Sequence, residues 1–250
     1  MNGLRAAGMG ILLALGAVGA TAGPEANGIQ TRADVERWLR EYHVRPRPEL
    51  TVAALRVLER ERLLEQPPAQ AALAGFLSEV FRAHPDCVAA WGPELDALAV
   101  KTRRMVWLGL WLAGTPPATA WLQERAARAE GEDRRYLDVL LRQKPFALLR
   151  KRIVAPVDVD LLWGAFMANG KPEYLKRIIA LLPWCHDLRD LNRRLVGESA
   201  RWLLTNQAGR HPQVRQLCEE ELGRAREPLK TILEDVLRTT DELAGDRDGH

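Results

Sequence analysis

The sequence predicts an all-α protein of irregular stacked helical hairpins, either α-solenoid-like or arranged as an orthogonal bundle. Three observations predict this fold class. Apolar residues recur every three or four positions through most of the 250 residues, glycine and proline interrupt these runs, and no segment alternates as a strand would. A chain of this length can bury one large helical core or two smaller ones.

The N-terminal 22 residues have the features of a cleaved secretory signal. Arg5 precedes an apolar stretch over 9–18 that is too short to span a bilayer, and small residues lead up to Ala22. We therefore expect cleavage after Ala22 and a periplasmic or secreted protein that keeps no transmembrane anchor. No cysteine lies near this cut, so a lipid-modified N-terminus is not expected. Residues 23–30 are then a linker.

Charge and cysteine content exclude few partners. Loss of residues 1–22 removes one arginine and no acid, which leaves a net charge of +2, and such a balance does not favour nucleic acid. Cys87, Cys185 and Cys218 are an odd set for an oxidising compartment. A bridge between Cys185 and Cys218 is one interpretation, and small buried hydrophobic residues are the favoured one.

A single helical domain is expected over 31–243, with a candidate division near 153–158 and a disordered tail at 244–250. Its first helix opens at Thr31, an N-cap residue that Asp34 supports from the first turn. Further apolar stripes cover Leu73–Phe81 and Leu229–Leu237. The longest amphipathic segment has one predicted buried face, which comprises Leu188, Leu191, Leu195, Val196, Ser199, Trp202 and Leu203.

Two turns have the same construction 56 positions apart. An apolar run is followed in each by glycine, one further residue and proline, at Gly114–Pro116 and at Gly170–Pro172, and then by a second apolar run. Glycine ends a helix by adopting a left-handed conformation, and proline suits the first helical position because its missing N–H has no partner there. Looser copies occur at His84-Pro85 and His211-Pro212. The pattern predicts helical hairpins, whose irregular spacing matches no named repeat.

Residues 153–157 are interpreted as a connector between two helices. Pro156 cannot donate to a sheet ladder, which argues against a strand. Asp158 or Asp160 suits the N-cap of the helix that follows.

Two segments carry a resemblance to a known family. Residues 160–179, DLLWGAFMANGKPEYLKRII, and 200–214, ARWLLTNQAGRHPQV, resemble an uncharacterised family of exported, helical-repeat-like bacterial proteins. The resemblance covers about residues 155–220. It implies a helix from tryptophan to glycine, a helix that ends in paired isoleucines, and a tryptophan helix that ends in a His-Pro turn. It implies no reaction.

Patterns for catalysis are weak in this sequence. Ser199 lacks the second glycine of a nucleophile elbow. Glu198-Ser199 on a helix resembles the lytic transglycosylases, in which one glutamate acts as general acid and base on peptidoglycan. The Gly-Leu-Met-Gln-type segment expected downstream is absent, and neighbouring arginines favour a surface ion pair for Glu198. The sequence therefore favours a protein without intrinsic catalysis, with a transglycosylase-like enzyme as the alternative.

Histidine offers a metal-binding interpretation. His84 and His211 each precede a proline, and His186 adjoins Cys185, so folding can bring two or three of these ligands together around zinc. Capping of helices at solvent is the favoured interpretation. No metal and no cofactor are expected.

A run of cations gives the chain its clearest charge asymmetry. This basic patch consists of Arg142, Lys144, Arg150, Lys151 and Arg152. It can attract anionic lipid or an acidic envelope polymer, although a solvated helix face is the favoured interpretation.

The function predicted from these observations is that of a helical binding or structural module of the bacterial cell envelope, with another envelope protein as the partner. The aromatic anchors are expected to pack, beside two polar residues at a turn. These candidate binding residues are Trp163, Tyr174, Trp202, Asn206 and His211.

Overall fold

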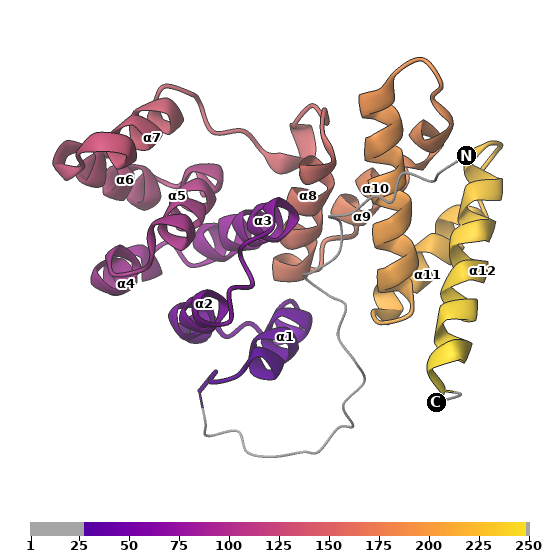
Figure 1. Ribbon diagram of the computed structural model, residues 1–250, viewed down its shortest axis with the longest axis horizontal. Helices are drawn as coiled ribbons and strands as arrows, with labels where there is room; N and C mark the ends of the chain where they lie inside the picture. The colour runs from indigo at the N-terminus through magenta and orange to yellow at the C-terminus, as the bar shows by residue number, and fades with distance from the viewer. Residues whose placement is uncertain (1–27, 249–250) are drawn as a thin grey trace.

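The computed structural model describes residues 28–248 and has only helices in this range (Figure 1). The predicted all-α class is confirmed. The expected signal and its cleavage site lie outside the described residues. The α-helices are α1 (Arg32–Glu41), α2 (Thr51–Arg60), α3 (Pro67–Ala83), α4 (Cys87–Asp96), α5 (Val100–Ala113), α6 (Pro116–Arg128), α7 (Gly131–Leu141), α8 (Pro156–Asn169), α9 (Pro172–Ile179), α10 (Leu191–Ala208), α11 (Pro212–Leu222) and α12 (Leu229–Asp248). Short 3-10 helices are η1 (Pro48–Leu50), η2 (Leu148–Arg150) and η3 (Leu182–His186).

Helix α3 lies at the centre of this arrangement (Figure 1). Pro67 occupies its first position, where no backbone donor is required, and the apolar residues that follow are buried on several sides. α3 packs against α5 and, more extensively, against α8. One continuous apolar core results, which extends along the chain from Ile29 to Val236.

Glycine brings the neighbours of α3 unusually close. A Cβ atom added to Gly164 of α8 would lie 1.8 Å from the carbonyl oxygen of Ala72, and one added to Gly75 of α3 would lie 2.1 Å from the carbonyl oxygen of Leu161. The backbones of α3 and α8 therefore touch where the two helices cross. Gly109 gives α5 a similar, less extreme approach to α3.

Both predicted hairpin turns are present. Gly114 and Gly170 end α5 and α8 in the left-handed conformation, with φ angles of 63° and 66°. Pro116 and Pro172 then open α6 and α9. The looser copy before α11 differs, because Gly209 has φ −75° and is right-handed.

The caps of two helices test the predicted starts. Thr31 accepts a hydrogen bond from the amide of Asp34, whose carboxylate accepts one from the amide of Thr31, so this predicted cap is confirmed. The prediction that Asp158 or Asp160 caps α8 is wrong, since the N-cap is Ala155. Asp158 instead lies in the first turn and accepts from the preceding amides, 2.8 Å away in the nearer case.

Two predicted boundaries near the C-terminus move. α10 begins at Leu191, so Leu188 lies before the helix, with Asp190 as the cap. α12 continues to Asp248, beyond the expected end of the helical domain at residue 243. The disorder expected for residues 244–250 stays a prediction. Among the described helices, none combines the length and apolarity that crossing a membrane requires.

The crossing of α3 and α8 predicts a large effect of one methyl group. Gly164→Ala should lower the free energy of unfolding by about 3 kcal/mol or more, because the new Cβ collides with a rigid carbonyl. Urea unfolding measures the loss. Gly245→Ala is the matched control: this glycine is also helical but has nothing within 4 Å, so alanine should stabilise by about 0.5–1 kcal/mol. Equal stability of the two variants would contradict the close crossing.

Candidate functional site

Large apolar side chains meet solvent on the outer face of α10. Leu191 is 59% exposed, Leu195 46% and Trp202 41%, and Leu188, just before the helix, is 86% exposed. Leu191, Leu195 and Trp202 follow at intervals of four and seven residues, which place these three on one side of α10. We call these four residues the α10 stripe. The prediction that they belong to a buried face is wrong.

The opposite face of α10 is the one that packs. Its buried residues include Val196, Ala200, Leu203 and Leu204, which join the core. Close contact with η3 holds this face, because a Cβ atom on Gly197 would lie 2.3 Å from the backbone nitrogen of Cys185. The α10 stripe is therefore presented by a helix that is fixed from behind.

Charged residues flank the α10 stripe. Glu198 lies three residues after Leu195 on nearly the same face, and its side chain is 48% exposed. Its carboxylate is 3.9 Å from the guanidinium of Arg201, which also pairs with Asp235 of α12 at 2.6 Å. The exposed side chain of Arg194 makes no hydrogen bond or ion pair within the described part of the chain. Glu198 is thus about half exposed and ion-paired, as the favoured interpretation of a surface ion pair predicted.

The five candidate binding residues do not converge. Trp163 and His211 are buried together, with ring centroids 5.3 Å apart in an edge-on contact. Asn206 donates to the carbonyl of Trp202 at 2.8 Å on the outer part of α10. Tyr174 is buried elsewhere. The expectation that Trp202 packs inside is wrong, and only this residue of the five belongs to the α10 stripe.

Tyr174 contributes to a buried polar cluster around Glu79. Its hydroxyl donates to Glu79 at 2.9 Å, and Asn169 donates to the second carboxylate oxygen at 2.7 Å. Arg82 pairs with the same carboxylate and donates to the carbonyl of Leu112 at 2.8 Å. Burial, with the nearby carboxylate, raises the pKa of Tyr174. This cluster links α3, α5, α8 and α9, and its groups satisfy one another.

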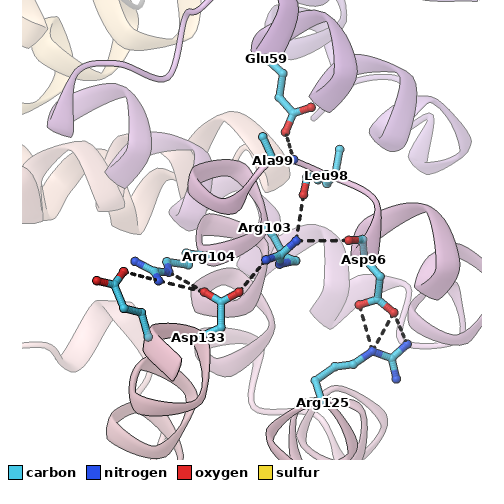
Figure 2. A network of polar contacts seen from close by, with 9 residues as sticks. Glu59, Asp96, Leu98, Ala99, Arg103, Arg104, Arg125 and Asp133 are labelled. Atoms are coloured by element: carbon cyan, nitrogen blue, oxygen red, sulfur yellow. Dashed lines mark hydrogen bonds and ion pairs between the residues drawn. The ribbon is translucent and has the colours of Figure 1, made fainter. Parts of the chain in front are cut away.

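A recess lies between α4, α5, α6 and α7, and its lining combines apolar side chains with charged ones. Figure 2 shows the ion pairs among the charged residues around it. The volume of the recess is about 320 Å³. Asp133 accepts hydrogen bonds from Arg103 at 2.5 Å and from Arg104 at 2.9 Å, whereas Asp96 accepts from Arg125 at 2.8 Å. Burial raises the pKa of Asp133, but the hydrogen bonds from the two arginines outweigh it, so this pKa is lowered. The acids and bases of the recess thus largely neutralise one another.

The basic patch is exposed except at one position. Arg142, Lys144, Arg150 and Arg152 have exposed side chains that make no ion pair among the residues described. Lys151 is half-buried and pairs with Asp158 at 2.8 Å. Four of the five cations therefore remain available to an anionic surface, and this contact stays a prediction.

Histidine and cysteine form no metal site in the described structure. No group of three or more His, Cys, Asp or Glu side chains there is placed to hold a metal ion. All three cysteines are free, so the bridge between Cys185 and Cys218 is absent. Both thiols are buried, as the favoured interpretation predicted, and burial raises the pKa of Cys218 to about 12.

No protein family model, curated protein or solved structure matches the chain. The resemblance over residues 155–220 stays a prediction. The α10 stripe is the candidate functional site because its large apolar side chains are exposed.

Burial of His211 predicts one dependence on pH. Burial, together with the positive charges of Arg40, His43 and Arg210, lowers the pKa of His211 from 6.5 to about 4. The unfolded chain then binds the proton more readily, so stability is lost as pH falls from about 6.5 towards 4. His211→Gln should reduce this loss by about 2–3 kcal/mol between pH 7.5 and 4.5, measured by urea unfolding. An identical loss in both proteins would contradict the assignment.

Asp160 should have the opposite effect. One of its carboxylate oxygens is buried without a hydrogen-bond partner, and burial raises its pKa from 3.8 to about 7. The folded state then holds a proton that the unfolded state has released, so stability falls as pH rises from about 4 to 7. Asp160→Asn, which cannot ionise, should gain about 1–3 kcal/mol relative to wild type between pH 5 and pH 8. Denaturation midpoints at the two pH values measure this, and a constant difference would count against it.

Proposed function

We propose that the protein is an exported helical module of the bacterial cell envelope, which acts by binding another envelope protein and has no intrinsic catalysis. The α10 stripe is the observation that carries this proposal. Three large apolar residues on one exposed face of α10, and Leu188 just before the helix, are available to a partner. The exported location is supported by the signal-like pattern of residues 1–22.

The energetics of the α10 stripe support a role in association. Single exposed leucines are common, but a contiguous apolar surface with a polar rim is typical of an interaction site. Covering such a surface is favourable by about 25 cal/mol for each Å² of apolar area removed from water. Tryptophan at one end of the stripe is also among the residues that contribute most to protein interfaces.

The enzyme alternative has less support. Glu198 is about half exposed and lies on the rim of the α10 stripe, not beside the recess between α4 and α7. Its carboxylate pairs with Arg201 at 3.9 Å. Release of soluble fragments from peptidoglycan sacculi by the purified protein would overturn the proposal of a module without catalysis.

Photo-crosslinking tests the proposed function. A photoreactive residue at position 195, within the α10 stripe, should give a discrete adduct with a protein in an envelope fraction. The same residue at position 154 is the matched control, because Val154 is 52% exposed but lies in the connector before α8. Recovered protein should begin at Gly23 if the signal is removed as expected. Equal labelling from the two positions would contradict the proposed binding. Recovered protein that still begins at residue 1 would contradict the proposed export.

A further inference from the structure

We propose that the partner of the α10 stripe presents an amphipathic helix with an acidic flank and one basic side chain opposite Glu198. This inference rests on the proposed function and names the chemistry of the partner. It follows from the shape of the stripe, from the charge at its centre and from the charges at its edge.

The shape of the stripe matches a helix. Leu191, Leu195 and Trp202 follow one another at the spacings of an interhelical seam, and Glu198 fills the interval between the last two. The helical part from Leu191 to Trp202 is about 17 Å long at 1.5 Å per residue. Because Leu191, Leu195 and Trp202 form a narrow ridge on α10, a second helix can lie along it and cover these three residues.

The carboxylate within the stripe argues against a membrane as the occupant. Glu198 lies one turn from Leu195 and one turn from Trp202, so insertion of the stripe into lipid would carry its charge along. An ionised carboxylate is costly in the apolar part of a bilayer. A partner helix, in contrast, can place a lysine or arginine opposite it.

A second copy of the chain is also a poor occupant. In an antiparallel pair that sets Leu191 against Trp202, each Leu195 would face a Glu198 carboxylate. In a parallel pair in register, the two Glu198 side chains would face each other. Both arrangements bury the Glu198 carboxylate at the seam with no opposite charge from the second copy directly facing it, which is unfavourable.

Charge at the edge of the stripe favours an acidic partner. Residues 188–203 contain four arginines and two acids. Of the arginines, Arg201 is engaged by Asp235 and Arg193 by Asp187, whereas the exposed Arg194 has no ion pair in the described structure. An acidic flank would therefore approach this edge with Coulomb attraction, and binding should weaken as salt is added.

Designed peptides test the inference. One helical peptide has a leucine seam, glutamates on both flanks and a single lysine at the middle of the seam, where either orientation places it opposite Glu198. A second peptide has lysines on the flanks. The full mature protein should bind the first peptide about tenfold more tightly or better in fluorescence anisotropy at low salt. Leu195→Glu should remove this binding, and Val154→Glu, the exposed control, should not.

A charge exchange separates recognition from packing. Glu198→Lys should weaken binding of the first peptide, and a peptide with glutamate in place of its central lysine should restore it. Leu195 and Glu198 are both exposed, so the circular dichroism spectra of Leu195→Glu and Glu198→Lys should match that of the wild-type protein. Equal affinity for the two flank charges, absence of binding, or no recovery in the exchange would overturn the inference.

Other occupants give distinct results. Dimerisation in sedimentation experiments, or flotation with anionic vesicles, that is lost in Leu195→Glu would also overturn it. A crosslink from position 195 to a protein without an acidic helix would leave the proposed function intact and overturn only this inference about the partner.

Discussion

Backbone contact between α3 and α8 is the constraint on which the rest of the structure depends. Gly75 and Gly164 leave no room for a side chain where these helices cross, so residues far apart in the sequence are held at backbone distance. This crossing brings α9 to the end of α3, where Tyr174 and Asn169 satisfy the buried carboxylate of Glu79. The polar cluster therefore depends on the helix packing. The close crossing at the glycines places the donors within hydrogen-bonding distance of Glu79, and these bonds offset the cost of burying its carboxylate.

Local features of the fold could be predicted from the sequence, and long-range ones could not. Gly114-Thr-Pro and Gly170-Lys-Pro specify their turns by themselves, since left-handed glycine and first-turn proline act within a few residues. Gly75 and Gly164 look like ordinary helical glycines until the partner backbone is known. Similarly, Glu79 is the lone acid of an apolar helix, which indicates a buried role but not which residues donate to it.

The sequence pattern of α10 does not by itself predict the α10 stripe. α10 is apolar on two sides, and a single-stripe interpretation merged Leu191, Leu195 and Trp202 with Val196 and Leu203. One buried face is enough to pack a helix against its core. In α10 this face includes Val196 and Leu203, and the helix packs against η3, α11 and α12. Once the faces are separated on a 3.6-residue period, the leftover apolar residues form their own stripe. The sequence therefore predicts that α10 has two apolar stripes. It does not predict which of the two packs against the core.

The recess between α4 and α7 and the α10 stripe differ in what a ligand would gain. In the recess, Asp133 and Asp96 already accept hydrogen bonds from arginines, so a charged ligand would have to replace existing partners (Figure 2). At the α10 stripe nothing within the described chain competes for the apolar surface. The helix that carries it is fixed through Gly197 against η3, so little conformational freedom is lost on association. For this reason we place the proposed binding site at the α10 stripe and not in the recess.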